Sequence, residues 1–204
     1  MTVDESARAS TPNKFELRRA STRAGLLALG LSRFPIKGFS ATTINDLVSD
    51  SEYTRGAFYF HFAGKEEFFL EVLQARAALR DKWWLAVQSP GVDDIEGAVV
   101  AALARLREQT DGHPWLLLIA DFAQCAVGNG DFTRSLQEMY RQWIAEISCF
   151  VREMRERGFA REGVSDEALA EQIFAAAQGY TLHRAVYGIA GDGLIDALVR
   201  IVAP

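Results

Sequence analysis

Apolar residues recur at steps of three and four along most of the 204-residue chain, which is the period of amphipathic helices. No segment combines sustained apolar–polar alternation with a hairpin turn, so strands are not indicated. The pattern therefore predicts an all-α protein. Helices are expected at residues 14–33, just after Thr42 or Thr43, and at 54–60, 65–87, 93–109, 114–127, 131–157, 166–189 and 194–202.

Glycine and proline residues mark the end of the first predicted helix. Pro35 and Gly38 are expected to stop it, because proline cannot continue the hydrogen-bond ladder and glycine suits the turn that follows. Gly30 lies inside this helix, where glycine lowers stability by about 1 kcal/mol relative to alanine.

The N-terminal part of the chain contains three predicted helices with a tight turn between the second and the third. This arrangement is typical of a helix-turn-helix unit, in which the second helix of the pair enters the major groove of DNA. The spacing alone fits an ordinary three-helix bundle equally well.

The net charge of −5 argues against a DNA-binding protein until its distribution is considered. Between Asn13 and Lys65 there are eight Lys or Arg and four Asp or Glu, whereas from Glu66 onward there are thirteen and twenty-one. A basic N-terminal stretch on an acidic chain favours a polyanionic partner at this end.

Composition and short motifs narrow the class further. Hydrophobic residues make up 49% of the chain, and neither a signal peptide nor a membrane-spanning run is present, so a cytoplasmic protein is expected. Cys125 and Cys149 are interpreted as buried, reduced thiols, with redox sensing as the alternative. The common catalytic motifs are missing, and His61, His113 and His183 are scattered, so no enzymatic activity, cofactor or metal is expected.

Two stretches carry a specific pattern. Residues 38–47 read Gly-Phe-Ser-Ala-Thr-Thr-Ile-Asn-Asp-Leu, and residues 54–62 read Thr-Arg-Gly-Ala-Phe-Tyr-Phe-His-Phe, followed by Lys65-Glu66. Together with Arg23 and Phe34, this pattern resembles the TetR family of transcriptional regulators over residues 23–69. The resemblance implies a helix-turn-helix DNA-binding domain at 13–64 and a helical effector-binding and dimerisation domain at 65–204.

The resemblance also implies which side chains contact DNA. Thr43 can offer a hydroxyl and a backbone N–H to a phosphate, and Arg55 can read guanine or hold a phosphate. Gly56 has no side chain, so the helix can approach the DNA backbone closely. The complete expected set is Thr43, Thr54, Arg55, Gly56, Tyr59, His61 and Lys65.

The turn between the two helices departs from the family pattern. Ser51-Glu52-Tyr53-Thr54 stands where the family usually has Ala-Gly-Val-Ser. Glycine is favoured there because the turn tends to need a positive φ, which costs other residues about 1 kcal/mol or more. Glu52 is therefore expected either to accept that strain or to change the turn.

For the C-terminal domain, the resemblance implies a homodimer interface and a small-molecule pocket. Helices 131–157 and 166–189 are expected to pack against their symmetry mates as a four-helix bundle, unless the stripe at Met139, Trp143, Phe150 and Met154 is an internal core. On the second of these helices, the expected contact set includes small residues that allow close approach: Ala175, Ala176, Gly179, Leu182, His183 and Val186. The pocket is expected to be mostly apolar. Its expected lining is Trp83, Trp115, Phe122, Tyr140, Trp143, Phe174 and Gln178.

Two functions fit these observations. The first is a dimeric repressor that binds a palindromic operator in double-stranded DNA and is released by a hydrophobic or aromatic small molecule, with no membrane partner. The second is a helical ligand- or partner-binding protein with a weakened DNA reader, an idea motivated by Glu52 and the acidic total charge.

Overall fold

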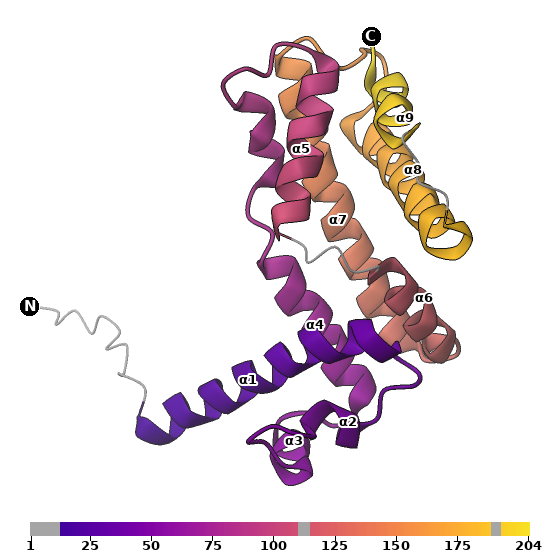
Figure 1. Cartoon of the computed structure of the whole chain (residues 1–204). Coiled ribbons are helices and arrows are strands. Elements are labelled where there is room, and N and C mark those ends of the chain that lie inside the picture. Colours follow the sequence, from indigo (N-terminus) through magenta and orange to yellow (C-terminus); the bar gives the residue numbers. More distant parts are fainter. Residues whose placement is uncertain (1–12, 110–114, 189–192) are drawn as a thin grey trace, which may run out of the picture.

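The computed structural model describes residues 13–109, 115–188 and 193–204, and every regular element within them is helical, which confirms the all-α prediction. The elements are α1 (Lys14–Lys37), α2 (Ile44–Val48), α3 (Arg55–His61), α4 (Lys65–Ala78), the 3₁₀ helix η1 (Trp83–Gln88), α5 (Ile95–Gln109), α6 (Trp115–Ala126), α7 (Gly130–Glu156), α8 (Asp166–Tyr187) and α9 (Gly193–Val202). Figure 1 shows α1, α2 and α3 at one end of an elongated molecule and α5, α8 and α9 at the other, with α4, α6 and α7 between them. No helix in the described part is both long and apolar enough to cross a membrane.

Helix α1 is fixed at both ends by hydrogen bonds. Asn13 Oδ1 accepts from the backbone N–H groups of Phe15 and Glu16 at 2.9 Å each, and the Glu16 carboxylate accepts from the Asn13 N–H at 2.8 Å, which forms a capping box. At the other end Gly38 has φ of 87° and donates to Phe34 O at 2.9 Å. The expected end at residue 33 is wrong, because Pro35 removes only its own donor and the helix continues to Lys37.

The predicted helix 65–87 is broken in the structure. Helix α4 ends at Ala78, and η1 begins at Trp83 after Lys82, whose φ of 33° lies in the left-handed region. The break directs Arg80 and Trp83 toward Glu146 of α7, at 3.1 Å from Arg80 Nη2 and 3.2 Å from Trp83 Nε1. These contacts with a distant helix prevail over the helical pattern of the local sequence.

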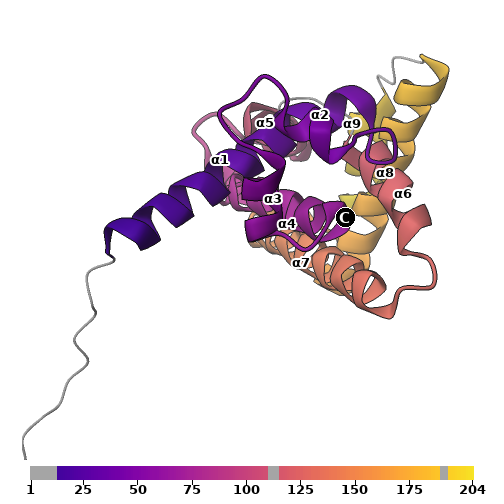
Figure 2. The same ribbon diagram turned by 90° about the horizontal axis from the view of Figure 1, so that it is seen from below.

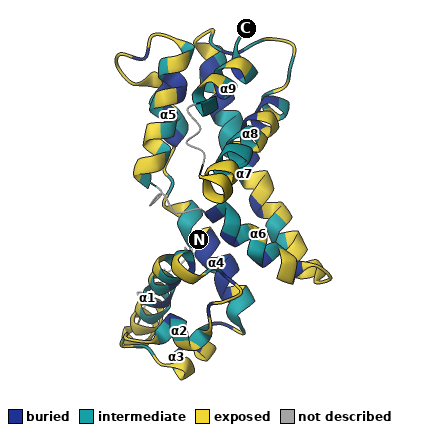
Figure 3. Ribbon diagram, turned by 45° about the vertical axis from the view of Figure 1, so that its right-hand side comes forward, coloured by how far each residue is buried: buried dark blue, intermediate teal, exposed yellow. Residues whose placement is uncertain are grey.

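The first of two hydrophobic cores joins the N-terminal helices to α4 and α6. Its centre is a group of fully buried phenylalanines from α1, the α1–α2 loop, α3, α4 and α6, called the phenylalanine cluster: Phe34, Phe39, Phe58, Phe62, Phe68, Phe69 and Phe122. The buried residues of α4 appear in dark blue in Figure 3. Helix α4 belongs to the second expected domain, but it packs into the same core as the helices of the first. The domain boundary expected between residues 64 and 65 therefore stays a prediction.

The second core lies at the opposite end, among η1, α5, α7, α8 and α9. Phe150 and Met154 are buried in this core, and Met139 is buried in the first. The expected dimer stripe on α7 is therefore wrong for these three residues, because their own chain already covers them. For these three residues the alternative, a stripe that packs inside the protomer, is correct.

At Gly30, α1 packs closely against α4. A Cβ atom at this position would lie 2.4 Å from Val72 Cγ2 and 2.9 Å from Phe68 Cζ. Both neighbours are fully buried, so neither can move aside freely. The glycine therefore permits packing that outweighs its low helix propensity.

We expect Gly30→Ala to destabilise the protein by about 1–3 kcal/mol, because overpacking exceeds the gain of about 1 kcal/mol in helix propensity. Denaturant unfolding followed by circular dichroism measures this difference. A variant more stable than the wild type would show that α1 and α4 are not held at this distance.

Candidate functional site

Helix α2 is tied to the C-terminal half of α1. Lys37 forms a salt bridge of 2.6 Å with Asp46, and Arg33 donates to the backbone carbonyls of Asp46 and Ser49. Hydrogen bonds from Lys37, and then from Thr43, hold the pKa of Asp46 well below its ordinary value. The Thr43 hydroxyl and N–H both donate to Asp46 Oδ2, at 2.6 and 2.9 Å, so the groups expected to contact phosphate are engaged within the chain.

In the turn between α2 and α3, Glu52 does not adopt the left-handed backbone conformation that would strain it. The left-handed residue is Asp50, with φ of 51°, and aspartate tolerates this conformation better than most residues. Ser51 Oγ donates to Val48 O at 2.7 Å and accepts from the Tyr53 N–H at 3.2 Å, which closes the turn. The first alternative, strain at Glu52, is therefore wrong, and the turn differs instead.

Helix α3 presents one polar side to solvent. Thr54 caps the helix by accepting from the Ala57 N–H at 3.1 Å, while Phe58 is buried in the phenylalanine cluster. Arg55 is exposed, and it forms no salt bridge within the described residues. Tyr59 is 50% exposed, so its hydroxyl end is available beside Arg55 one turn earlier.

Gly56 differs from Gly30 in its surroundings. Among the described residues, a Cβ atom at position 56 would meet only Thr54 Oγ1, at 3.6 Å, so their packing does not require glycine there. Its φ is not in the left-handed region either. A glycine in an exposed helix that serves neither packing nor conformation is consistent with close approach of an external partner.

Lys65 and His61, two of the expected DNA contacts, are both partly buried by neighbouring residues of the chain. Lys65 Nζ donates to Phe39 O at 2.9 Å and lies 4.4 Å from the Phe39 ring centre, so it holds the α1–α2 loop rather than facing outward with α3. His61 is half-buried at the end of α3. Burial, and then the charges of Arg19 and Arg23, lower the pKa of His61, so a neutral imidazole with one N–H is present at pH 7.

A cavity of about 330 Å³ lies between α4, α6, α7 and α8, and residues of η1, α5 and α9 also line it. Its walls are mostly apolar, and its polar groups include Gln178 and the Arg80–Glu146 ion pair. Of the expected lining, the structure brings together Trp83, Trp115, Trp143, Phe174 and Gln178 around this space.

The other two expected pocket residues lie elsewhere. Phe122 is buried in the phenylalanine cluster, with its ring centre 5.0 Å from that of Phe39. Tyr140 is exposed and packs against the outer side of the lining residue Phe174, at 5.7 Å between ring centres. Their assignment to the pocket is wrong, because helical spacing does not distinguish the side of α6 or α7 that faces the cavity.

Asp121 connects α6 to the loop between α1 and α2, a role that the sequence pattern did not indicate. Its carboxylate accepts from the Ser40 N–H at 2.8 Å and from the Ser40 hydroxyl. Burial alone raises the pKa of Asp121, but the hydrogen bonds from Ser40 and Phe39 and the charge of Lys65 together lower it below its ordinary value. The same helix lines the cavity with Trp115, so one rigid element touches both places.

The capped pair α2 and α3, with a short turn and an exposed polar side on the second helix, defines a helix-turn-helix protein of the DNA-binding class. Residues 26–72 match the family described as "Bacterial regulatory proteins, tetR family". The chain is similar to the TetR family of transcriptional regulators, through this match and through its relatives.

Known relatives extend this match beyond the N-terminal helices. The transcriptional repressor DhaR of Mycobacterium sp. (strain GP1) is 26% identical over 175 residues, which cover 81% of this chain and 83% of DhaR. The regulator QacR of Staphylococcus aureus is 34% identical over 59 residues, covering 29% of this chain and 31% of QacR. The reduced form of Escherichia coli NemR has a similar fold, with a TM-score of 0.69 at 24% identity over 89% of this chain and 98% of NemR.

We expect Gly56→Ala to raise the free energy of unfolding by about 0.5–1 kcal/mol, since alanine favours an exposed helix. The same variant should bind DNA more weakly, because the methyl group would stand between α3 and the DNA. Denaturant unfolding and fluorescence anisotropy measure the two effects. Equal or tighter DNA binding would place the interface away from this side of α3.

Proposed function

We propose that the protein is a dimeric repressor that binds a palindromic operator through α3 and leaves it when a hydrophobic or aromatic molecule fills the cavity. The observation that carries the DNA-binding part is the exposed side of α3, where Arg55 has no salt bridge and Gly56 meets no packing need among the described residues, and where Tyr59 is half-exposed. Thr54 and His61 flank this side as the remaining proposed contacts. Thr43 and Lys65 act in this proposal by holding the loop and α2 in place.

Arg55→Ala should weaken binding to a duplex selected from a random-sequence library by about 1–3 kcal/mol per half-site, because a bidentate arginine contact to guanine contributes this much discrimination. Anisotropy titrations of purified protein measure the loss. Arg107→Ala, an exposed change of the same charge on α5, should leave the affinity unchanged.

Two results would contradict this assignment. If Arg55→Ala bound the selected duplex as tightly as the wild type, α3 would not be the reading helix. If the library yielded no enriched sequence even at low salt, the alternative of a ligand- or partner-binding protein with a weakened DNA reader would be favoured.

The proposed dimer uses the exposed part of α8. Leu182 and Val186 are 42% and 57% exposed and lie one turn apart, so they form an apolar strip on this helix. A Cβ atom at Gly179 would meet nothing within 4 Å, which leaves room for a second helix to approach. A two-fold pairing here would present two copies of α3 to successive turns of DNA.

Helix α6 supplies a physical route from the cavity to the operator. It contributes Trp115, Leu116 and Ile119 to the cavity wall and holds the α1–α2 loop through Asp121. A ligand that fits the cavity better when α6 has shifted would pull on Ser40 and thereby move α2 and α3. Such a ligand can change DNA affinity only by its difference in affinity for the two positions of α6.

The coupling can be separated from ligand binding with two variants. The probe is the compound that most strongly changes tryptophan fluorescence in a panel of lipophilic and aromatic molecules. Ala177→Leu, which fills the cavity, should abolish the fluorescence change and the release of DNA together. Asp121→Ala should keep the fluorescence change, whereas the ligand-induced loss of DNA affinity should fall several-fold.

Asp131→Ala, an exposed acidic residue at the start of α7, serves as the charge-matched control and should behave as the wild type. Normal release of DNA from Asp121→Ala would exclude the Ser40 contact as the route. Normal ligand binding by Ala177→Leu would exclude the cavity as the binding place.

A further inference from the structure

The first two turns of α1 project beyond the body of the molecule. Every residue from Asn13 to Ser21 is exposed, and Figures 1 and 2 both show this part of α1 extending away from the other helices. The capping box at Asn13 nevertheless fixes its start. In Figure 1 the projecting end slopes to the level of α2 and α3, the end of the molecule that holds the DNA reader.

Half of the basic residues between Asn13 and Lys65 are engaged within the chain. Arg23 pairs with Glu71, Lys37 pairs with Asp46, and Arg33 and Lys65 hold backbone carbonyls. The remaining four are Lys14, Arg18, Arg19 and Arg55, and none of them has an ion-pair partner among the described residues. Three of the four lie on the projecting part of α1.

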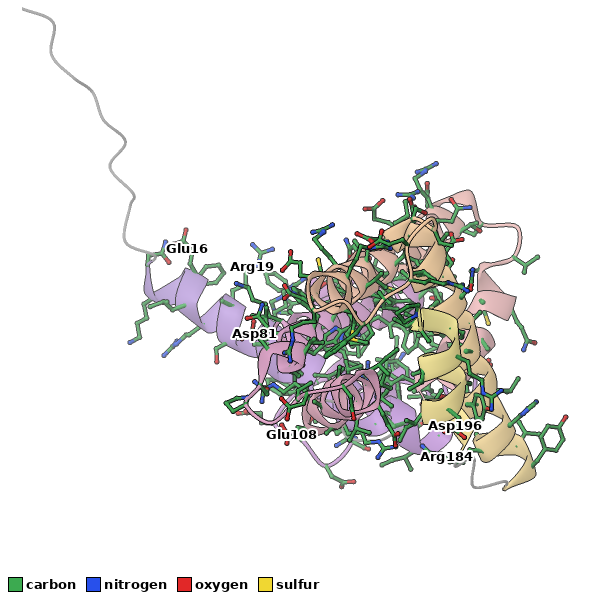
Figure 4. The ribbon with its side chains drawn as sticks, turned by 90° about the horizontal axis from the view of Figure 1, so that it is seen from above. Glu16, Arg19, Asp81, Glu108, Arg184 and Asp196 are labelled. Atoms are coloured by element: carbon green, nitrogen blue, oxygen red, sulfur yellow. The ribbon has the colours of Figure 1, made fainter. Side chains whose placement is uncertain are left out.

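The projecting part contains one acidic residue, Glu16, which forms no salt bridge with the three basic residues beside it. Glu16 is used by the capping box, where its carboxylate accepts from the Asn13 N–H. Figure 4 shows Glu16 and Arg19 on the part of α1 that extends outside the helical body. The projecting part therefore carries an excess of positive charge, and its Lys14 and Arg18 have neither an ion-pair partner nor a ring contact among the described residues.

Contacts with the helix-turn-helix unit orient this charge. The space beside Gly25 is filled by Tyr53 of the turn, since a Cβ atom at Gly25 would lie 1.9 Å from the Tyr53 hydroxyl oxygen. Lys14 and Arg18 lie within about 20° of Gly25 around the axis of a regular α-helix. They therefore extend the face of α1 that meets the turn before α3.

Arg19 contacts the other end of the reading helix. Its guanidinium carbon lies 5.5 Å from the ring centre of Phe60, which is 60% exposed. Helix α1 thus passes along α3 from its start, at Tyr53, to its end, at Phe60, and then continues outward. Lys14 lies roughly 7 Å farther along the helix axis than Arg19, at a rise of 1.5 Å per residue.

We propose that the projecting part of α1 is a second DNA-binding element, in which Lys14 and Arg18 contact phosphates that flank the half-site read by α3. This inference rests on the proposed operator binding. Contacts of this kind add affinity without reading bases, and they make binding more sensitive to salt. The chain as a whole is acidic, but Lys14 and Arg18 place positive charge without an ion-pair partner near α3. Such local positive charge can attract DNA phosphates.

The test uses the full chain and a palindromic duplex selected from a random library, either trimmed to the palindrome or extended by about one helical turn on each side. The double variant Lys14→Ala/Arg18→Ala should lose about tenfold in affinity for the extended duplex. The dependence of log K on log salt should become shallower by about 3 to 4 for a dimer that loses four phosphate contacts. On the trimmed duplex the variant and the wild type should differ little.

Arg107→Ala/Arg200→Ala removes the same charge from exposed positions on α5 and α9 and should match the wild type on both duplexes. If Lys14→Ala/Arg18→Ala equalled the wild type on the extended duplex while Arg55→Ala lost binding, the α1 element would be rejected and the α3 reader would stand. An equal loss with Arg107→Ala/Arg200→Ala would reject it in favour of a total-charge effect. Failure of the wild type to select any sequence would overturn both proposals.

Discussion

The phenylalanine cluster is the packing constraint on which both ends of the molecule depend. It draws rings from α1, the α1–α2 loop, α3, α4 and α6, and the rings of Phe34 and Phe69 meet edge to face at 4.9 Å between centres. Close-packed rings of this kind leave little room for one helix to move alone. The position of the DNA reader is consequently determined by α4 and α6 as well as by its own turn.

Phe122 connects the phenylalanine cluster to the proposed regulation by a ligand. Its ring joins α6 to the cluster, while three other side chains of α6 line the cavity and Asp121 holds Ser40. The ring contact of Phe122 with Phe39 holds α6 against the N-terminal helices. The hydrogen bonds of Asp121 with Ser40 hold α6 to the loop that precedes α2. A displacement of α6 would therefore be transmitted to the loop, because the two contacts act on neighbouring residues, Phe39 and Ser40.

The hydrophobic period predicted nearly all helices, and the residue motif at 38–47 and 54–66 predicted the position of the helix-turn-helix, since both are local patterns. It failed where distant residues decide the local structure. Nothing near Lys82 indicates that Glu146 will hold Arg80 and Trp83 and so end α4 early. The same limit explains the assignment of Phe122 to the pocket, because its ring partner Phe39 lies far away in the chain. Thr43 differs, because its partner Asp46 lies only three residues away in a capping box.

Three glycines in the N-terminal helices show how structure separates cases that look alike in sequence. Gly25 and Gly30 lack side chains because Tyr53, Phe68 and Val72 occupy the space, so the fold itself explains them. Gly56 faces open space on the exposed side of α3, where glycine only weakens the helix. A residue that costs stability without serving the fold points to a requirement outside the chain, and the requirement proposed at this position is access to DNA.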